Sequence, residues 1–135
     1  MKALSFPKSS RLLTPKDYAR VFNDVQIRVP HRNFLILATT NGQDHARIGL
    51  VFSKKNLKLA VQRNRIKRRV RETFRLQPDF PALDIIVLGR RGLSDLENPV
   101  LNGLLEDLWS RLKRKHRHLV TTVPQSQPEA SKGRG

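Results

Sequence analysis

The sequence predicts a single α+β domain, a sandwich of helices on a small sheet. Three observations lead to this prediction. Short apolar runs typical of strands alternate with segments whose apolar residues recur at helical spacing. Their order along the chain is helix, two or three strands, helix, strand, helix. The 135 residues are about the length of one domain, so these elements are expected to share one core.

The first helix is expected to begin in the stretch "LTPKDY". Thr14 can cap the helix N-terminus, and Pro15 fits the first helical position. Asp17 then lies near the positive end of the helix dipole. This short helix ends near residue 24, and its apolar stripe consists of Tyr18, Val21, Phe22 and Val25.

The following segments are typical of strands. The apolar runs at residues 34–39 and 46–52 flank an Asn-Gly turn signal, so these two strands are expected to pair as a hairpin. Residues 26–29 form a candidate edge strand that ends at Pro30. The continuous apolar run "LDIIVLG", residues 83–89, indicates a strand that is buried on both faces.

The last helix is expected to start at Asn98, with Pro99 in its first turn. Its apolar residues recur at helical spacing and are assigned to the core, because a small sheet must be covered. They are Leu101, Leu104, Leu105, Leu108 and Leu112, with Trp109 beside them. The domain is expected to span residues 1–118, with an irregular N-terminus, and residues 119–135 are predicted to be disordered.

Composition narrows the class of partner. The chain has 27 Lys plus Arg against 11 Asp plus Glu, a net charge of +16, and most of the excess lies in residues 54–75 and 111–117. Such a charge attracts polyanions, either nucleic acid or an anionic membrane. Without cysteine, neither disulfides nor thiolate metal sites can form. No signal peptide or membrane span is recognisable, so a cytoplasmic location away from membranes is expected.

The segment 57–76 is predicted to be an amphipathic helix. Its core-facing stripe consists of Leu59, Gln62, Ile66, Val70, Thr73 and Phe74. Asn64, Lys67, Arg68, Arg71 and Arg75 gather on the far side, Arg63 lies at one border of the stripe, and Arg65 and Arg69 form a row at the other.

These basic residues stack with almost no carboxylate between them, which destabilises an isolated helix. The arginine fork suits bidentate phosphate contacts, so nucleic acid is preferred over a merely solvated face. Because Pro78 stops the helix and no heptad zipper follows, RNA is favoured over DNA.

The stretch "SKKNLKLAVQRNRIKRRVRETFR", residues 53–75, resembles the signature of the bacterial ribonuclease P protein family. That signature centres on Arg-Asn-Arg followed by Lys-Arg, here residues 63–68. The upstream "FPKSSRLLTPKDYARVF" resembles the N-terminal pattern of the family, and the likeness extends from about residue 6 to residue 115.

The resemblance implies an α/β sandwich with a small mixed sheet and a left-handed β-α-β crossover through the motif helix. It also implies a protein subunit without catalytic residues of its own, which assists a catalytic RNA in removing the 5′ leader of precursor tRNA. In this family the RNA carries the chemistry with Mg²⁺, so the expected partners are the catalytic RNA and the leader. No protein partner is required.

Two sets of residues follow from the resemblance. The RNA-binding face of the motif helix would comprise Arg63, Asn64, Arg65, Lys67, Arg68, Arg69, Arg71 and Arg75. The leader cleft, between the sheet and the first helix, would comprise Tyr18, Phe22, Phe34 and Arg11. Leu37 stands where some members have an aromatic residue, and Lys58-Leu59 where some have Gly-Asn.

The residues themselves indicate no active site in the protein. The acidic residues are scattered, and the His-x-His pair at residues 116–118 is too weak a signal for a metal site. Two alternatives remain open: a structural RNA-binding protein of ribosomal type, and a DNA-binding regulator that dimerises through its leucine-rich last helix.

Overall fold

The computed structural model describes residues 10–122, and its element order confirms the predicted α+β class. The elements are α1 (Pro15–Asn23), β1 (Ile27–Pro30), β2 (Phe34–Thr40), β3 (Arg47–Val51), α2 (Ala60–Arg75), β4 (Leu83–Gly89), the 3-10 turn η3 (Leu93–Asp95) and α3 (Asn98–Thr122). None of the helices within this part of the chain is both long and apolar enough to cross a membrane.

Two boundaries differ from the prediction by more than one residue. Helix α2 begins at Ala60 rather than at residue 57, because Leu57 is buried in the core and the residues before it form a turn. Helix α3 continues to Thr122, so residues 119–122, which the sequence assigned to a disordered tail, are helical. The rest of that predicted tail, residues 123–135, lies outside the described residues.

The four strands form one mixed sheet in the order β1-β2-β4-β3. Strand β4 pairs antiparallel with β2 along its whole length, from Leu83 opposite Thr40 to Gly89 opposite Phe34, and parallel with β3. The predicted hairpin between β2 and β3 is therefore wrong. The continuously buried strand β4 lies in the interior of the sheet between β2 and β3, where both of its faces are covered.

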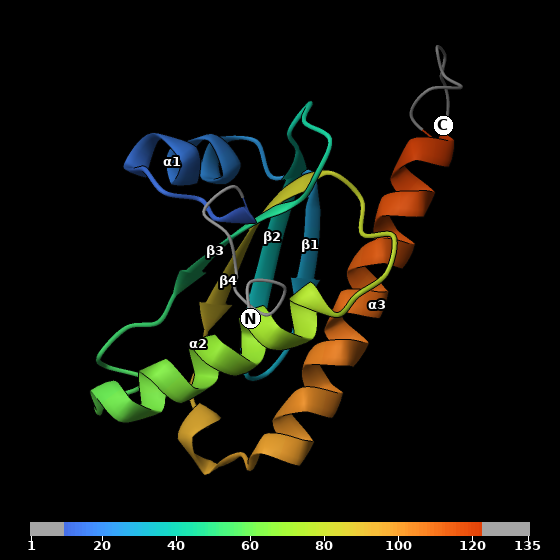
Figure 1. Cartoon of the computed structure of the whole chain (residues 1–135). Coiled ribbons are helices and arrows are strands. Elements are labelled where there is room, and N and C mark those ends of the chain that lie inside the picture. Colours follow the sequence, from blue (N-terminus) through green and yellow to red (C-terminus); the bar gives the residue numbers. More distant parts are fainter. Residues whose placement is uncertain (1–9, 123–135) are drawn as a thin grey trace, which may run out of the picture.

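The connection from β3 to β4 runs through α2. Parallel neighbours need such a crossover, and crossovers of this kind are right-handed in about 98% of cases. In Figure 1, α2 lies in front of the sheet, both strands run down the page, and β4 lies to the right of β3. This arrangement is the left-handed crossover that the resemblance implied.

Helices cover the two faces of the sheet unequally. On one face α2 and α3 pack over alternate strand residues, including Ile36, Ile85 and Val87. On the other face α1 covers a smaller cluster around Leu37 and Ile86. The sheet therefore lies between a two-helix layer and a single short helix (Figure 1).

An aromatic cluster joins α2 to α3. The ring of Trp109 lies 5.4 Å from that of Phe74 and 6.0 Å from that of Phe80, both edge to face. The indole Nε1 of Trp109 donates a buried hydrogen bond of 2.9 Å to Thr73 Oγ1. Since Trp109 is fully buried, this bond satisfies its one polar atom and fixes α3 against α2.

Helix α1 is capped as its sequence predicted. The backbone N–H of Asp17 donates to Thr14 Oγ1 at 3.1 Å, and the Asp17 carboxylate accepts from the Thr14 N–H at 3.3 Å. This reciprocal pair satisfies two backbone donors at the N-terminus of a nine-residue helix.

A buried carboxylate ties α1 to the sheet. Asp84, on β4, is fully buried and accepts from Arg47 Nε at 2.9 Å and Nη2 at 2.7 Å, and from Asn41 Nδ2 at 2.9 Å. Arg20 of α1 also pairs with it. Burial alone would raise the pKa of Asp84, but hydrogen bonds from Arg47 and Asn41 and the charges of Arg47 and Arg20 lower it below its ordinary value.

Replacement of Asp84 is expected to destabilise the fold. Asp84→Asn removes the carboxylate shared by Arg47 and Arg20 and leaves Arg47 with the more distant Asp17 carboxylate, 3.8 Å away, as its countercharge, which should lower the free energy of unfolding by about 3 kcal/mol in urea titrations. Because the folded-state pKa is lowered, wild-type stability is complete above the ordinary pKa of 3.8 and is lost as the pH falls below it. The Asp84→Asn variant should therefore lose less of its free energy of unfolding than the wild type as the pH falls. The exposed Asp95→Asn serves as the control, and equal stability of both variants at neutral pH would refute this role.

Candidate nucleic-acid interface

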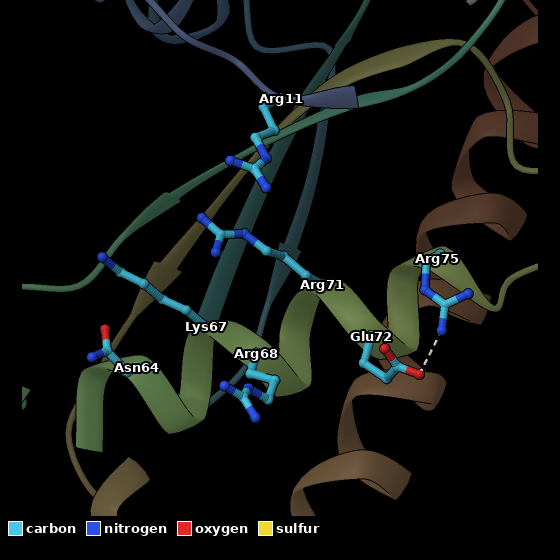
Figure 2. Close-up of a pocket in the computed structure, with 7 residues that line it drawn as sticks. All are labelled: Arg11, Asn64, Lys67, Arg68, Arg71, Glu72 and Arg75. Carbon is cyan, nitrogen blue, oxygen red and sulfur yellow. Dashed lines mark hydrogen bonds and ion pairs between the residues drawn. The ribbon is translucent and has the colours of Figure 1, made fainter. Parts of the chain in front are cut away.

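The polar face of α2 is hollowed into a cationic cavity of about 380 Å³. Five of the eight predicted motif-helix residues line it, together with Arg11 and Glu72. Those five are Asn64, Lys67, Arg68, Arg71 and Arg75 (Figure 2). The opposite face of α2 supplies Ile66, Val70, Thr73 and Phe74 to the core, as the helical period predicted. Leu59, predicted on the same stripe, is instead the N-cap before the helix and is 62% exposed.

Arg11 reaches this cavity from the outer edge of the sheet. It forms a parallel bridge with Ile48 of β3, and the N–H of the next residue, Leu12, donates to the Ile48 carbonyl at 3.0 Å. Because side chains alternate along extended backbone, Leu12 is buried beneath α1 whereas Arg11 lies on the α2 side. Figure 2 shows Arg11 and Arg71 pointing toward one another. Arg11 thus lines the α2 cavity rather than the leader cleft to which it was assigned.

The cavity concentrates positive charge. Burial lowers the pKa of Arg71 below its ordinary value and the charge of Arg11 lowers it further, although Tyr18 opposes this. The one carboxylate in the lining, Glu72, already pairs with Arg75 at 2.6 Å. An arrangement that holds guanidinium groups together at a cost favours the approach of an anion.

Arg63 stabilises the start of α2. Its Nη1 donates to the carbonyl oxygens of Leu57 at 2.7 Å and Lys58 at 3.1 Å. The N-cap of α2 is Leu59, which offers no side-chain acceptor or donor. The long Arg63 side chain therefore holds the turn that leads into the helix. Sequence reasoning missed this role because its only signal is the lack of a capping residue.

Arg65 connects α2 to the last helix. Its Nε donates to Gln62 Oε1 at 3.0 Å and its Nη1 to Asn98 Oδ1 at 2.8 Å, at the start of α3. A second hollow, of about 350 Å³, opens on this side of α2. Its lining is Val61, Asn64, Arg65, Arg68, Arg69 and Asn98. The basic row at this border of the helix therefore also lines an accessible hollow.

Tyr18 packs against the sheet at Gly49. A Cβ atom at Gly49 would lie 2.7 Å from the Tyr18 ring, so only glycine permits this contact. Tyr18 is half-buried beside the Val21–Ile86 cluster, whereas Phe22, one turn further along α1, is 46% exposed. Of the two aromatic residues predicted on this helix, Phe22 presents the larger accessible surface.

Phe34 lies on the other face of the sheet. It is fully buried, its ring centroid is 6.4 Å from that of Phe52, and it belongs to the core under α2 and α3. Its assignment to the leader cleft is therefore wrong. In a strand that begins at Phe34, the residues that point toward α1 are Leu35 and Leu37.

An apolar row remains partly uncovered beyond α1. Leu35 of β2 and Leu88 of β4 are register partners and only half-buried, and Val51 of β3, opposite Leu88, is 37% exposed. Sequence reasoning missed these residues, although the period of two along each strand was the signal that places them on the α1 face.

No group of three or more His, Cys, Asp or Glu side chains with the arrangement of a metal site occurs within residues 10–122. Two carboxylates near the basic surfaces, Asp84 and Glu72, are engaged with arginines. The donor atoms that this surface offers are cationic and suit an anion rather than a divalent metal.

Comparison with known proteins identifies relatives over nearly the whole chain. A family model described as Ribonuclease P matches residues 6–113. The chain is 66% identical over 133 residues to the ribonuclease P protein component of Marinobacter nauticus, covering 98% of this chain and 96% of that protein. It is 44% identical to the ribonuclease P protein component of Pseudomonas aeruginosa over 98% of both chains.

The similar solved structures are RNase P proteins as well. The RNase P protein of Staphylococcus aureus superposes with a TM-score of 0.66 at 29% identity, covering 86% of this chain and 98% of that one. The RNase P protein of Thermotoga maritima gives a TM-score of 0.65 at 31% identity, covering 77% and 96% respectively.

The contact between Tyr18 and Gly49 can be tested by a double-mutant cycle. Gly49→Ala is expected to lower the free energy of unfolding by about 1–3 kcal/mol, because the added methyl group displaces the Tyr18 ring. In a Tyr18→Ala background, Gly49→Ala should lower the free energy of unfolding by much less. Gly103→Ala, on α3 with no atom near the added methyl group, should instead be neutral or stabilising. Equal costs of Gly49→Ala in both backgrounds would contradict the contact.

Proposed function

The chain belongs to the ribonuclease P protein family, and on that premise we propose that it binds the catalytic RNA through α2 and promotes removal of the 5′ leader from precursor tRNA. The observation that carries the proposal is the cationic cavity, in which the one carboxylate is already paired. A structural RNA-binding protein of ribosomal type is the competing function, and the experiments below separate the two.

The residues of α2 act on RNA by neutralising phosphate charge. Lys67 and Arg68 extend from the outer face of a helix that the core holds rigidly. Arg71, which faces Arg11, can offer a planar fork to a phosphate that relieves the repulsion between the two guanidinium groups. Neutralised backbones approach one another more closely, so the protein should reduce the need for divalent cations.

The hydrolysis is proposed to proceed on the RNA, where bound Mg²⁺ would supply Lewis-acid chemistry at the attacking water and the phosphate. The described residues of the protein do not form a ligand set for this ion. The chain would contribute binding and orientation, and none of its side chains is assigned a bond-breaking role. The product would be a mature tRNA 5′ end.

The leader is proposed to lie on the α1 face of the sheet. There the half-buried Leu35 and Leu88 provide an apolar floor, and the exposed ring of Phe22 can stack on a base. Tyr18 is fixed over Gly49, so its ring shapes one part of this surface. The contacts are apolar and stacking in character, which suits leaders of varied sequence.

Reconstitution tests the subunit role directly. A bacterial ribonuclease P RNA with this protein is expected to cleave precursor tRNA at low Mg²⁺, whereas either component alone should be nearly inactive. The measured quantity is the rate of release of the leader, with the 5′ end of the product mapped. Tight binding of both RNAs without any stimulation would instead favour the structural RNA-binding protein.

Arg63 and the cavity residues are expected to separate stability from RNA binding. Arg63→Ala removes two hydrogen bonds to backbone and should lower the free energy of unfolding by about 1–2 kcal/mol. Lys67→Ala with Arg71→Ala should leave stability nearly unchanged but weaken binding of the catalytic RNA about tenfold or more, with a shallower salt dependence. Thermal melts and filter binding measure the two effects. If the Lys67→Ala, Arg71→Ala variant instead lost stability and kept its affinity for the RNA, the cavity residues would be structural.

Phe22 is expected to discriminate between substrates with and without a leader. Phe22→Ala should weaken binding of precursor tRNA to the reconstituted complex about fivefold or more, through the loss of one stacked base, and leave binding of mature tRNA unchanged. Val100→Ala, which truncates a similarly exposed apolar side chain on α3, is the control. If Phe22→Ala weakened binding of precursor tRNA and mature tRNA equally, Phe22 would not be part of the leader surface.

A further inference from the structure

A second basic groove lies between β1 and the last turns of α3. Its volume is about 710 Å³, larger than that of the α2 cavity. The lining residues are Val25, Gln26, Ile27, Arg28, Arg114, Lys115, His118 and Leu119. Because β1 and β3 form opposite edges of the sheet, this groove and the Arg11 side of the α2 cavity lie about three strand spacings, or ~14 Å, apart across it (Figure 1).

The groove is lined by both cationic and apolar side chains, the apolar ones being Val25, Ile27 and Leu119. Arg28 and Arg114 are exposed and carry no countercharge in the lining, which contains no carboxylate. The neighbouring carboxylate of Asp24 is engaged with Gln26 at 3.4 Å and Thr39 at 3.5 Å. Charge complementarity therefore favours a polyanion as the occupant.

The edge of β1 is closed to a further strand. The backbone carbonyl of Arg28 faces outward and accepts a hydrogen bond of 2.6 Å from Lys115 Nζ. Pro30, at the other outward position of this strand, has no N–H to donate. Since peptides that extend a sheet need these backbone groups, an extended polypeptide fits the groove poorly.

The C-terminal basic cluster of the sequence is divided by the helical period. Arg114 and Lys115 line the groove, whereas Lys113 turns toward α2, where its Nζ lies 3.3 Å from the Pro78 carbonyl oxygen and 5.9 Å from the Phe80 ring centroid. The groove-facing part of the cluster thus has no role in packing α3 on the core, apart from the Lys115 contact.

We propose that this groove binds the phosphodiester backbone of an RNA strand, as a second RNA contact on the opposite edge of the sheet from Arg11. The inference rests on the proposed function, since it assigns another part of the same RNA assembly to another face of the protein. Two strands of that assembly have the required chemistry, one from the catalytic RNA and one from the precursor tRNA.

The first experiment compares two variants of equal charge. Arg28→Gln with Arg114→Gln removes two groove cations, and Arg90→Gln with Arg91→Gln removes two exposed cations from the loop after β4. Affinity for the catalytic RNA alone, and for precursor tRNA in the reconstituted complex, is measured across salt concentrations. The groove variant should bind one of these RNAs about tenfold more weakly, with a salt slope smaller by roughly 1.5. If the groove variant lost no more RNA affinity than the loop variant, the proposal would be overturned.

The second experiment identifies the strand. Because the chain has no cysteine, Arg114→Cys can carry a single photoreactive group, and Glu106→Cys, exposed elsewhere on α3, carries the same group as the control. A crosslink from residue 114 that maps to the catalytic RNA or to the precursor tRNA supports the groove and names the source. RNA crosslinks no stronger than those from residue 106 would refute it.

These outcomes are separable from failure of the proposed function. If the wild-type protein stimulates leader removal but the groove and loop variants have the same RNA affinity, only the proposal of a second RNA contact fails. If the wild-type protein neither binds nor stimulates the RNA, the proposed function itself fails. Thermal melts of each variant confirm that the folded protein is being compared.

Discussion

The parallel pairing of β3 with β4 is the constraint on which the rest of the structure depends. Parallel neighbours cannot be joined by a tight turn, so the chain must leave one end of β3, cross a face of the sheet and return to start β4. Helix α2 makes that crossing, and its position over the sheet follows from the topology. One side of α2 must then be apolar, and its other side is left to the solvent, where Lys67 and Arg68 lie.

The burial of α2 offsets the electrostatic cost of its outer face. Stacked basic residues disfavour an isolated helix, but Ile66, Val70 and Phe74 are buried, and burial of such side chains stabilises by about 1.5–3 kcal/mol each. The Trp109–Thr73 hydrogen bond adds a fixed orientation. The core therefore holds cations in an arrangement that the helix alone would resist, and an anion bound at this face would relieve that repulsion.

Sequence patterns predicted what local periodicity determines. The core stripe and the basic face of α2 followed from the 3.6-residue period, and the capping of α1 from Thr14 and Asp17. The β2–β3 hairpin was wrong because strand pairing depends on which strand, far along the chain, is buried most completely. The positions of Phe34 and Arg11 were wrong for a related reason. Each depends on which face of the sheet an extended residue meets, and a resemblance in sequence does not specify that.

The arginines of this chain serve two different purposes, and net charge alone does not separate them. Arg20 and Arg47 share the buried carboxylate of Asp84, and Arg63 donates hydrogen bonds to backbone carbonyl oxygens. With so few acidic residues, the fold uses carbonyl oxygens in place of carboxylates to hold its own cations. The cations that line the two hollows lie toward opposite edges of the sheet, near Arg11 and near Arg28. A sheet of fixed width holds these two groups at a fixed spacing, so RNA that contacts both must adopt one orientation relative to the protein.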